Sequence, residues 1–185
     1  FGRQQQDYSA LIPEDCQLLL GSKYSVLRPE FINWRKCSLE RRSKPEFKNL
    51  LISMGGVDKD NLTESILDEL KISSLPDDIN ITVVMGRNSP HLHSVKSKAD
   101  KLLHKTNIEV NVDNMAEIMT NSDIAIGASG ATTWERCCLG VPTVQMAIAN
   151  NQQFLAEKLA RENIIKLIKE IKEITYLLES PFEWM

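Results

Sequence analysis

The sequence has no long apolar segment, few aromatic residues and only four cysteines among its 185 residues. Its longest apolar runs, such as 18–20 and 81–85, fall far short of the roughly 20 residues that span a bilayer. Hydrophobic residues nevertheless make up 42% of the chain and charged residues 25%, which is typical of a folded domain. We therefore expect one globular domain, or one lobe of a larger enzyme, with no membrane partner.

An excess of positive charge is also lacking. The 22 lysines and arginines are outnumbered by 25 aspartates and glutamates, which gives a net charge of −3. Proteins built around a polyanion usually carry a clear basic excess, so we expect no nucleic-acid partner. Residues 1–7 contain neither an initiating methionine nor the basic and apolar regions of a signal peptide. We expect the chain to be a piece of a longer protein.

Cysteine pairs with metal-binding spacing are absent. None of Cys16, Cys37, Cys137 and Cys138 forms a CxxC motif, and no nearby histidine completes a zinc-binding set. Reduced thiols of this kind are usual in cytosolic proteins. We therefore expect a cytoplasmic protein with no metal site and no cofactor.

From residue 49 onwards, short apolar strands alternate with amphipathic helices. Apolar or β-branched runs predict strands at 49–53, 80–85, 107–112, 123–126 and 141–146. Apolar residues at helical spacing predict helices at 61–72, 91–104, 114–120, 132–139, 152–162 and 165–178. Such alternation over short connections favours parallel strands that are covered on both sides. We predict an α/β fold, a Rossmann-like parallel sheet with helices on both faces.

The first 44 residues lack this alternation. A strand-like run at 16–20 precedes a turn at Gly21, and residues 33–48 show no clear period and an excess of basic side chains. We interpret residues 33–48 as a solvated linker, with a patch that attracts an anionic ligand or a partner domain as the alternative. We place a boundary near Pro45. Residues 1–44 are then the end of a preceding lobe with an interlobe linker, and residues 45–185 are the Rossmann-like domain.

Two glycine loops follow predicted strands. The first is Ser53-Met54-Gly55-Gly56, and the second is Gly127-Ala128-Ser129-Gly130-Ala131-Thr132-Thr133. Glycine lets a backbone approach a phosphate, the helix that follows offers free N–H groups, and Thr132 and Thr133 add hydroxyl donors. The same residues also serve as plain turn and cap residues. Neither loop is a GxxxxGK[ST] or GxGxxG motif, so ATPase and NAD-binding functions are disfavoured.

Three further polar residues lie near the same predicted sheet edge. Glu135 falls in the first turn of the helix after the second loop, where its carboxylate can accept both hydroxyls of a ribose. Asn151 and Gln152 begin another helix, and amides suit sugar hydroxyls. Each of the three also has a purely structural interpretation, as a dipole-stabilised carboxylate or as a helix cap.

Four segments resemble a known family, in this order: LLLGSKYSVLRPEF, LLISMGGVDKDNLT, VVMGRNSPHL and SDIAIGASGATTWERCCLGVPTVQMAIANNQ. They are similar to the C-terminal half of the UDP-2,4-diacetamido-2,4,6-trideoxy-β-L-altropyranose hydrolases, bacterial GT-B enzymes of pseudaminic acid biosynthesis. The resemblance implies that residues 45–185 are the UDP-binding C-terminal lobe of a GT-B fold, with UDP or a UDP-sugar as ligand. It implies that Ser129, Gly130, Ala131 and Thr132 hold the diphosphate and that Glu135 holds the ribose. Asn151 and Gln152 match a pair that faces the sugar and the β-phosphate, and Gly55 and Gly56 match the family's first glycine loop.

The resemblance also implies that catalysis is incomplete within this chain. In that family, water attacks the anomeric carbon, UDP leaves, and the base is a histidine in a lobe that precedes Phe1. We interpret His91, His93 and His104 as surface or capping residues and expect no catalytic residue here. The rival hypotheses are a GT-B glycosyltransferase, a UDP-sugar epimerase, and a scaffold or dimerisation module. Fusion to a CMP-sugar synthetase domain in the same chain is a further possibility.

Overall fold

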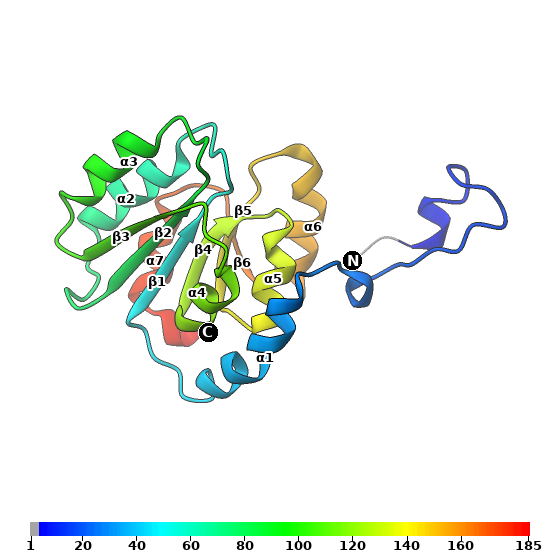
Figure 1. Cartoon of the computed structure of the whole chain (residues 1–185), viewed down its shortest axis with the longest axis horizontal. Coiled ribbons are helices and arrows are strands. Elements are labelled where there is room, and N and C mark those ends of the chain that lie inside the picture. Colours follow the sequence, from blue (N-terminus) through cyan, green and yellow to red (C-terminus); the bar gives the residue numbers. More distant parts are fainter. Residues whose placement is uncertain (1–3) are drawn as a thin grey trace.

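The computed structural model describes residues 4–185, which contain one six-stranded sheet (Figure 1). The strands are β1 (Asn49–Ser53), β2 (Asn80–Met85), β3 (Lys105–Val110), β4 (Ile124–Ala128), β5 (Thr143–Met146) and β6 (Lys166–Ile168). All neighbours pair in parallel, in the order β3-β2-β1-β4-β5-β6. This is the strand order of a Rossmann fold, which confirms the predicted fold class.

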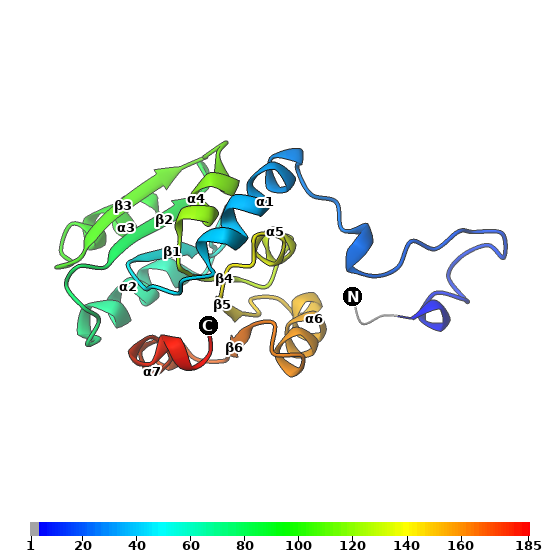
Figure 2. The same ribbon diagram turned by 90° about the horizontal axis from the view of Figure 1, so that it is seen from below.

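Helices cover both faces of the sheet, as predicted (Figures 1 and 2). One face is covered by α2 (Leu62–Ile72), α3 (Leu92–Ala99) and α7 (Glu173–Glu179). The other is covered by α1 (Pro29–Arg41), α4 (Met115–Asn121) and α5 (Thr132–Leu139). The remaining helix, α6 (Asn150–Arg161), connects β5 to β6.

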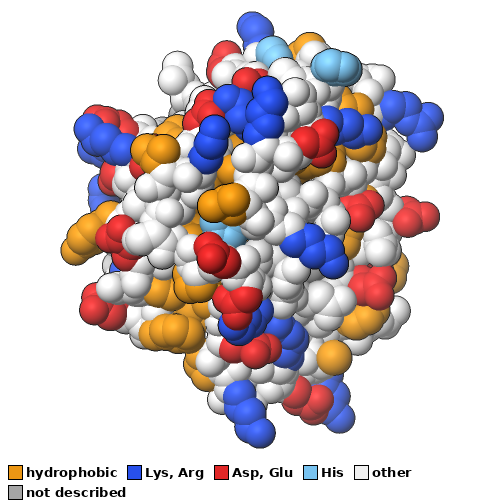
Figure 3. Space-filling model, turned by 90° about the vertical axis from the view of Figure 1, so that its left-hand side faces the viewer, with side chains coloured by type: hydrophobic (Ala, Val, Ile, Leu, Met, Phe, Trp, Pro, Cys, Tyr) orange, Lys and Arg blue, Asp and Glu red, His pale blue; other side chains and the backbone are white. Residues whose placement is uncertain are grey.

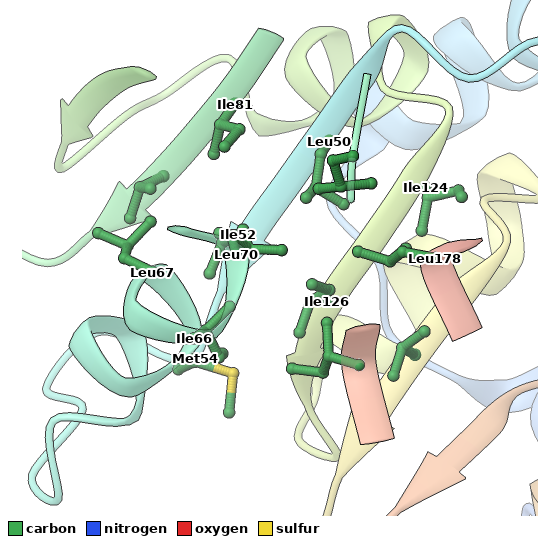
Figure 4. Packing of buried hydrophobic residues seen from close by; sticks show 14 of the residues in the cluster. Leu50, Ile52, Met54, Ile66, Leu67, Leu70, Ile81, Ile124, Ile126 and Leu178 are labelled. Atoms are coloured by element: carbon green, nitrogen blue, oxygen red, sulfur yellow. The ribbon is translucent and has the colours of Figure 1, made fainter. Parts of the chain in front are cut away.

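The hydrophobic core is divided between the two faces of the sheet. Leu50 and Ile52 of β1 belong to the cluster beneath α2, whereas Leu51 belongs to the cluster beneath α1 and α4. Burial on both faces explains why β1 is almost continuously apolar. Figure 4 shows the first cluster, in which strand residues face α2 and α7; its labelled members include Ile66, Leu67, Leu70, Ile81, Ile124, Ile126 and Leu178.

Residues 33–41 lie in helix α1, so the expectation of a solvated linker is wrong for them. Pro29 occupies the first turn, where its fixed φ suits a helix start. Phe31 is fully buried, and the Ser38 hydroxyl donates to the carbonyl oxygen of Leu139 at 2.7 Å. Only this narrow face of α1 is buried, and basic side chains elsewhere on the helix obscure its period in the sequence. The domain boundary near Pro45 stays a prediction.

Two other expected elements are wrong. Residues 16–20 form no strand, because none of the described residues pairs with them. The helix expected at 165–178 is instead β6, which pairs with β5, followed by the separate helix α7. A three-residue edge strand has no periodicity of its own, and it is defined only by the neighbouring strand that it joins.

Two features of the described residues concern membrane spans and surface charge. Within residues 4–185, no helix is long and apolar enough to cross a membrane. Figure 3 views the molecule from the β3 edge, where basic and acidic side chains are interspersed. This face therefore has no continuous patch of one sign.

Candidate functional site

The two glycine loops lie side by side at the carboxyl edge of the sheet. The first follows β1 and the second follows β4, and these strands are neighbours, with Ser53 opposite Gly127. From this pair the strand order runs outward in opposite directions, which makes it the topological switch point of the sheet. The fold therefore brings the two loops together where parallel α/β sheets bind their ligands.

The second loop presents three unpaired backbone donors. Among the described residues, the N–H groups of Gly130, Ala131 and Thr132 have no hydrogen-bond acceptor. The next two N–H groups are occupied, since those of Thr133 and Trp134 donate to the carbonyl oxygens of Gly130 and Ala131 at 3.1 Å. Ala131 is exposed, so solvent reaches this loop. Free N–H groups at the positive end of α5 form a cradle for an anion.

Two other predicted site residues direct their polar groups into the protein. The Ser129 hydroxyl donates to Gln145 Oε1 at 3.0 Å, and the Ser129 N–H donates to the carbonyl oxygen of Met146 at 3.0 Å. The Thr133 hydroxyl donates to the same Gln145 oxygen at 3.3 Å. Ser129, Thr133 and Gln145 are all at most 2% exposed. Their hydrogen bonds fix the conformation of the loop from its buried side. The free N–H groups of Gly130, Ala131 and Thr132 remain available to a ligand.

A buried arginine lies beneath the second loop. Arg136 is 1% exposed, and its Nη2 donates to the carbonyl oxygen of Ala128 at 2.8 Å. Its Nη1 donates to Thr132 Oγ1 at 3.1 Å. Burial lowers the pKa of Arg136 to about 10, so the guanidinium stays charged at neutral pH. Gly127 is required beside it, because a Cβ there would lie 2.6 Å from Nη1.

The first loop has a different construction. Gly55 has φ of +102°, a conformation that side chains rarely adopt, and the backbone of Gly56 packs tightly against Gly86 at the end of β2. Asp58 is buried and accepts the N–H groups of Leu62 and Thr63 at 3.0 and 2.9 Å. Its carboxylate therefore serves the start of α2. Both oxygens are engaged, which leaves Asp58 a poor candidate for a catalytic base.

Glu135 lies in the first turn of α5 and is held by the segment before α1. Arg28 Nη2 lies 3.6 Å from Glu135 Oε1 and 3.2 Å from Glu30 Oε1. Burial raises the pKa of the Glu135 carboxyl, and the charges of Arg28 and Arg136 oppose that rise. The structure thus places one carboxylate beside the second loop, partly buried and oriented by a cation.

The predicted amide pair lies at the start of α6, next to the same loop. Gln152 Oε1 accepts the N–H of Ile148 at 3.0 Å, which caps the turn before the helix. Gln152 Nε2 lies 3.9 Å from the position that a Cβ on Gly130 would take. Asn151 is exposed. The amide of Gln152 therefore borders the anion cradle.

The histidines do not gather into a catalytic or metal-binding group. His91 Nε2 lies 3.0 Å from the carbonyl oxygen of Lys59 and links the start of α3 to the segment that follows the first loop. His93 is exposed, as interpreted from the sequence. His104 is 7% exposed and lies after the end of α3, so its interpretation as a surface or capping residue is wrong. In the part of the chain that the structure describes, no three histidine, cysteine or carboxylate side chains are placed to hold a metal ion.

Sequence reasoning missed Arg136 and Gln145. Both are long polar side chains, and both are at most 1% exposed. The available signal was position: Arg136 lies three and four residues after Thr133 and Thr132, on the same face of α5. Gln145 interrupts the apolar run of β5 one strand away from the second loop.

Comparison with curated proteins finds relatives in polysaccharide and nucleotide-sugar metabolism. The chain is 31% identical over 142 residues to the spore coat polysaccharide biosynthesis protein SpsG of Bacillus subtilis, covering 76% of this chain and 40% of SpsG. It is 26% identical over 156 residues to the UDP-2,4-diacetamido-2,4,6-trideoxy-beta-L-altropyranose hydrolase of Campylobacter jejuni, covering 84% of this chain and 53% of that enzyme. The chain thus spans about half the length, or less, of these relatives.

Comparison with solved structures confirms the fold. The crystal structure of MurG from Acinetobacter baumannii superposes with a TM-score of 0.64 at 21% identity, covering 92% of this chain and 49% of MurG. The fold is that of the C-terminal lobe of GT-B glycosyltransferases. The model of the glycosyltransferase family 28 C-terminal domain matches residues 49–175, which extend from β1 into α7 and include both glycine loops. The chain therefore belongs to the glycosyltransferase family 28 C-terminal domain family.

Proposed function

We propose that this chain is the UDP-binding lobe of a nucleotide-sugar enzyme. The observation that carries the proposal is the set of three free N–H groups at Gly130, Ala131 and Thr132, at the switch point of the sheet. A diphosphate is the ligand that best matches consecutive donors at a helix N-terminus. Glu135, one helical turn on, is available for ribose hydroxyls, and the Gln152 amide borders the loop for the β-phosphate or the sugar.

For the whole protein, we propose hydrolysis of a diacetamido-trideoxy UDP-sugar in the biosynthesis of a nonulosonic acid. The similarity to the Campylobacter hydrolase supports this reading, and the lobe would act by holding the departing UDP. A leaving diphosphate gains charge as its bond to the sugar breaks, so fixed N–H donors stabilise the transition state. The base that activates water is proposed to lie in a preceding lobe, because Asp58 is engaged as a helix cap.

A glycosyltransferase is the second candidate, and the match to a glycosyltransferase domain model favours it. Both enzymes hold UDP in the same way, and they differ in what attacks the sugar. The whole protein separates them: a hydrolase releases UDP from the UDP-sugar in water alone, whereas a transferase releases UDP rapidly only when an acceptor is added. In either case we expect the 185-residue chain alone to bind UDP and not to release it from a UDP-sugar.

The direct test of UDP binding removes one donor from the cradle. Ala131→Pro eliminates a free N–H, and its φ of −58° already suits proline, so α5 should keep its structure. We expect calorimetry to show UDP affinity lowered by about 1.5–3 kcal/mol, the range for a hydrogen bond to a charged group, with uridine affinity unchanged. Ala131→Val keeps the N–H and is the matched control. Equal UDP affinity in all three proteins would contradict the proposal.

A further inference from the structure

Arg136 is a buried cation at the positive end of a helix. Helical side chains lean toward the N-terminus, so its guanidinium lies beneath the first turn of α5. It donates to the carbonyl oxygen of Ala128 and to the hydroxyl oxygens of Thr132 and Thr133, at 2.8, 3.1 and 3.4 Å. Within residues 4–185, Arg136 forms no ion pair with a carboxylate, and its Nε has no hydrogen-bond partner.

This placement is unfavourable for the unliganded protein. A buried charge is costly unless an opposite charge compensates it, and a cation near a helix N-terminus opposes the helix dipole. The chain nevertheless makes room for the guanidinium, because Gly127 has no Cβ to collide with Nη1. The two sources of positive potential, α5 and Arg136, are directed at the same place. That place is the cradle of N–H groups at the second loop.

We propose that Arg136 is a positioning residue that adapts the second glycine loop to a diphosphate. Its charge adds to that of the helix. Glu135 offsets part of that charge without forming an ion pair with Arg136, and a negative ligand at the cradle would offset more of it. Its hydrogen bond to Thr132 Oγ1 occupies that oxygen as an acceptor, so the hydroxyl hydrogen is free to be donated to a phosphate. Arg136 itself does not touch the ligand. This inference rests on the proposed binding of UDP.

The test measures how affinity depends on the number of phosphates. We expect the wild-type chain to bind UDP more tightly than UMP, and UMP more tightly than uridine. Arg136→Met should lower UDP affinity by about tenfold or more, as expected for one charge removed from a poorly solvated site, while uridine affinity stays within about twofold. Arg136→Lys keeps the charge and should retain part of the preference for UDP.

A second arginine, which is half-buried, provides the control. Arg42 is likewise held by carbonyl oxygens, those of Met119 and Ser122 at the far end of α4, and its pKa is also lowered to about 10. Arg42→Met should reduce stability yet preserve the wild-type ratio of UDP to uridine affinity. If Arg136→Met does not fold, Gly127→Ala serves instead, because its Cβ displaces the guanidinium without removing the charge.

The outcomes separate this inference from the proposal beneath it. A wild-type chain that binds UDP no better than uridine would contradict UDP binding itself. A wild-type preference for UDP that persists unchanged in folded Arg136→Met, or in Gly127→Ala if that is the protein available, would contradict only the role of Arg136.

Discussion

At the scale of single residues, the polar groups of the second glycine loop fall into two sets: some bind other parts of the protein, and others are free to bind a ligand. Ser129 and Thr133 donate their hydroxyls inward to Gln145, and only Gly130, Ala131 and Thr132 keep free N–H groups. The sequence could identify the loop, because glycine and threonine before a helix indicate it. It could not show this division, since the partner Gln145 comes from a different strand.

Glu135 gives a prediction in which affinity and stability respond oppositely to pH. Burial raises its pKa, so the folded state binds this proton more tightly than the unfolded state does. The contribution of Glu135 to the free energy of unfolding of the unliganded chain therefore increases as the pH falls through that pKa. Ribose hydroxyls donate to the ionised carboxylate, so affinity should fall over the same pH range. Glu135→Gln should weaken binding by about 1.5–3 kcal/mol near neutral pH and remove this pH dependence.

The ligand for that experiment is a UDP-sugar. Its diphosphate is esterified at both ends and does not titrate near neutral pH, whereas the terminal phosphate of UDP does. Titration calorimetry between mildly acidic and neutral pH gives the affinity. Glu30→Gln is the control, since Glu30 shares the ion pair with Arg28 but lies on α1. Because the Glu30 charge also raises the pKa of Glu135, this substitution should move the pH dependence to lower pH without abolishing it. A pH dependence that persists in Glu135→Gln, or vanishes in Glu30→Gln, would contradict the ribose assignment.

At the scale of elements, Asp123 joins α1 to the centre of the sheet. Its Oδ1 lies 2.5 Å from Arg41 Nη2 at the end of α1, and its Oδ2 accepts the N–H groups of Lys48 and Asn49 at the start of β1. Asp123 is 3% exposed, and removing it takes away the acceptor of three part-buried hydrogen bonds, from Arg41, Lys48 and Asn49. We expect Asp123→Ala to lower the free energy of unfolding by about 3–5 kcal/mol.

Urea denaturation, followed by circular dichroism, measures this loss. Asp78→Ala is the control, because the ion pair of Asp78 with Lys48 is exposed and should contribute almost nothing. If the two substitutions had equal effects, α1 would not be an integral part of the folded domain.

The central elements were predictable from the sequence, whereas the peripheral ones were not. Strands β1 and β4 are buried on both sides, and β2 is buried on one side and partly buried on the other. This burial imposes the apolar runs from which the three strands were predicted. Helix α1 buries only one narrow face, and β6 is a three-residue strand at the sheet edge. Such elements depend on contacts with distant parts of the chain, and these contacts leave little local pattern.

At the scale of the whole molecule, strand order explains why two separate loops form one candidate site. Residues 55 and 130 are far apart in the chain, yet pairing of β1 with β4 places their loops at one edge. Parallel strands and short connections were predictable, and they already placed both loops at carboxyl ends. That the loops are neighbours follows only from the strand order, which the sequence pattern did not specify.

The central claim is that the N–H groups at the start of α5 bind the diphosphate of UDP. Amide resonances of the isotope-labelled chain, titrated with UDP and separately with uridine, test it most directly. We expect the largest UDP-specific downfield shifts at Gly130, Ala131 and Thr132, with smaller ones at Gly55 and Gly56, and none of these shifts with uridine. UDP-induced shifts that leave Gly130, Ala131 and Thr132 unmoved, or shifts there of equal size with uridine, would contradict the claim.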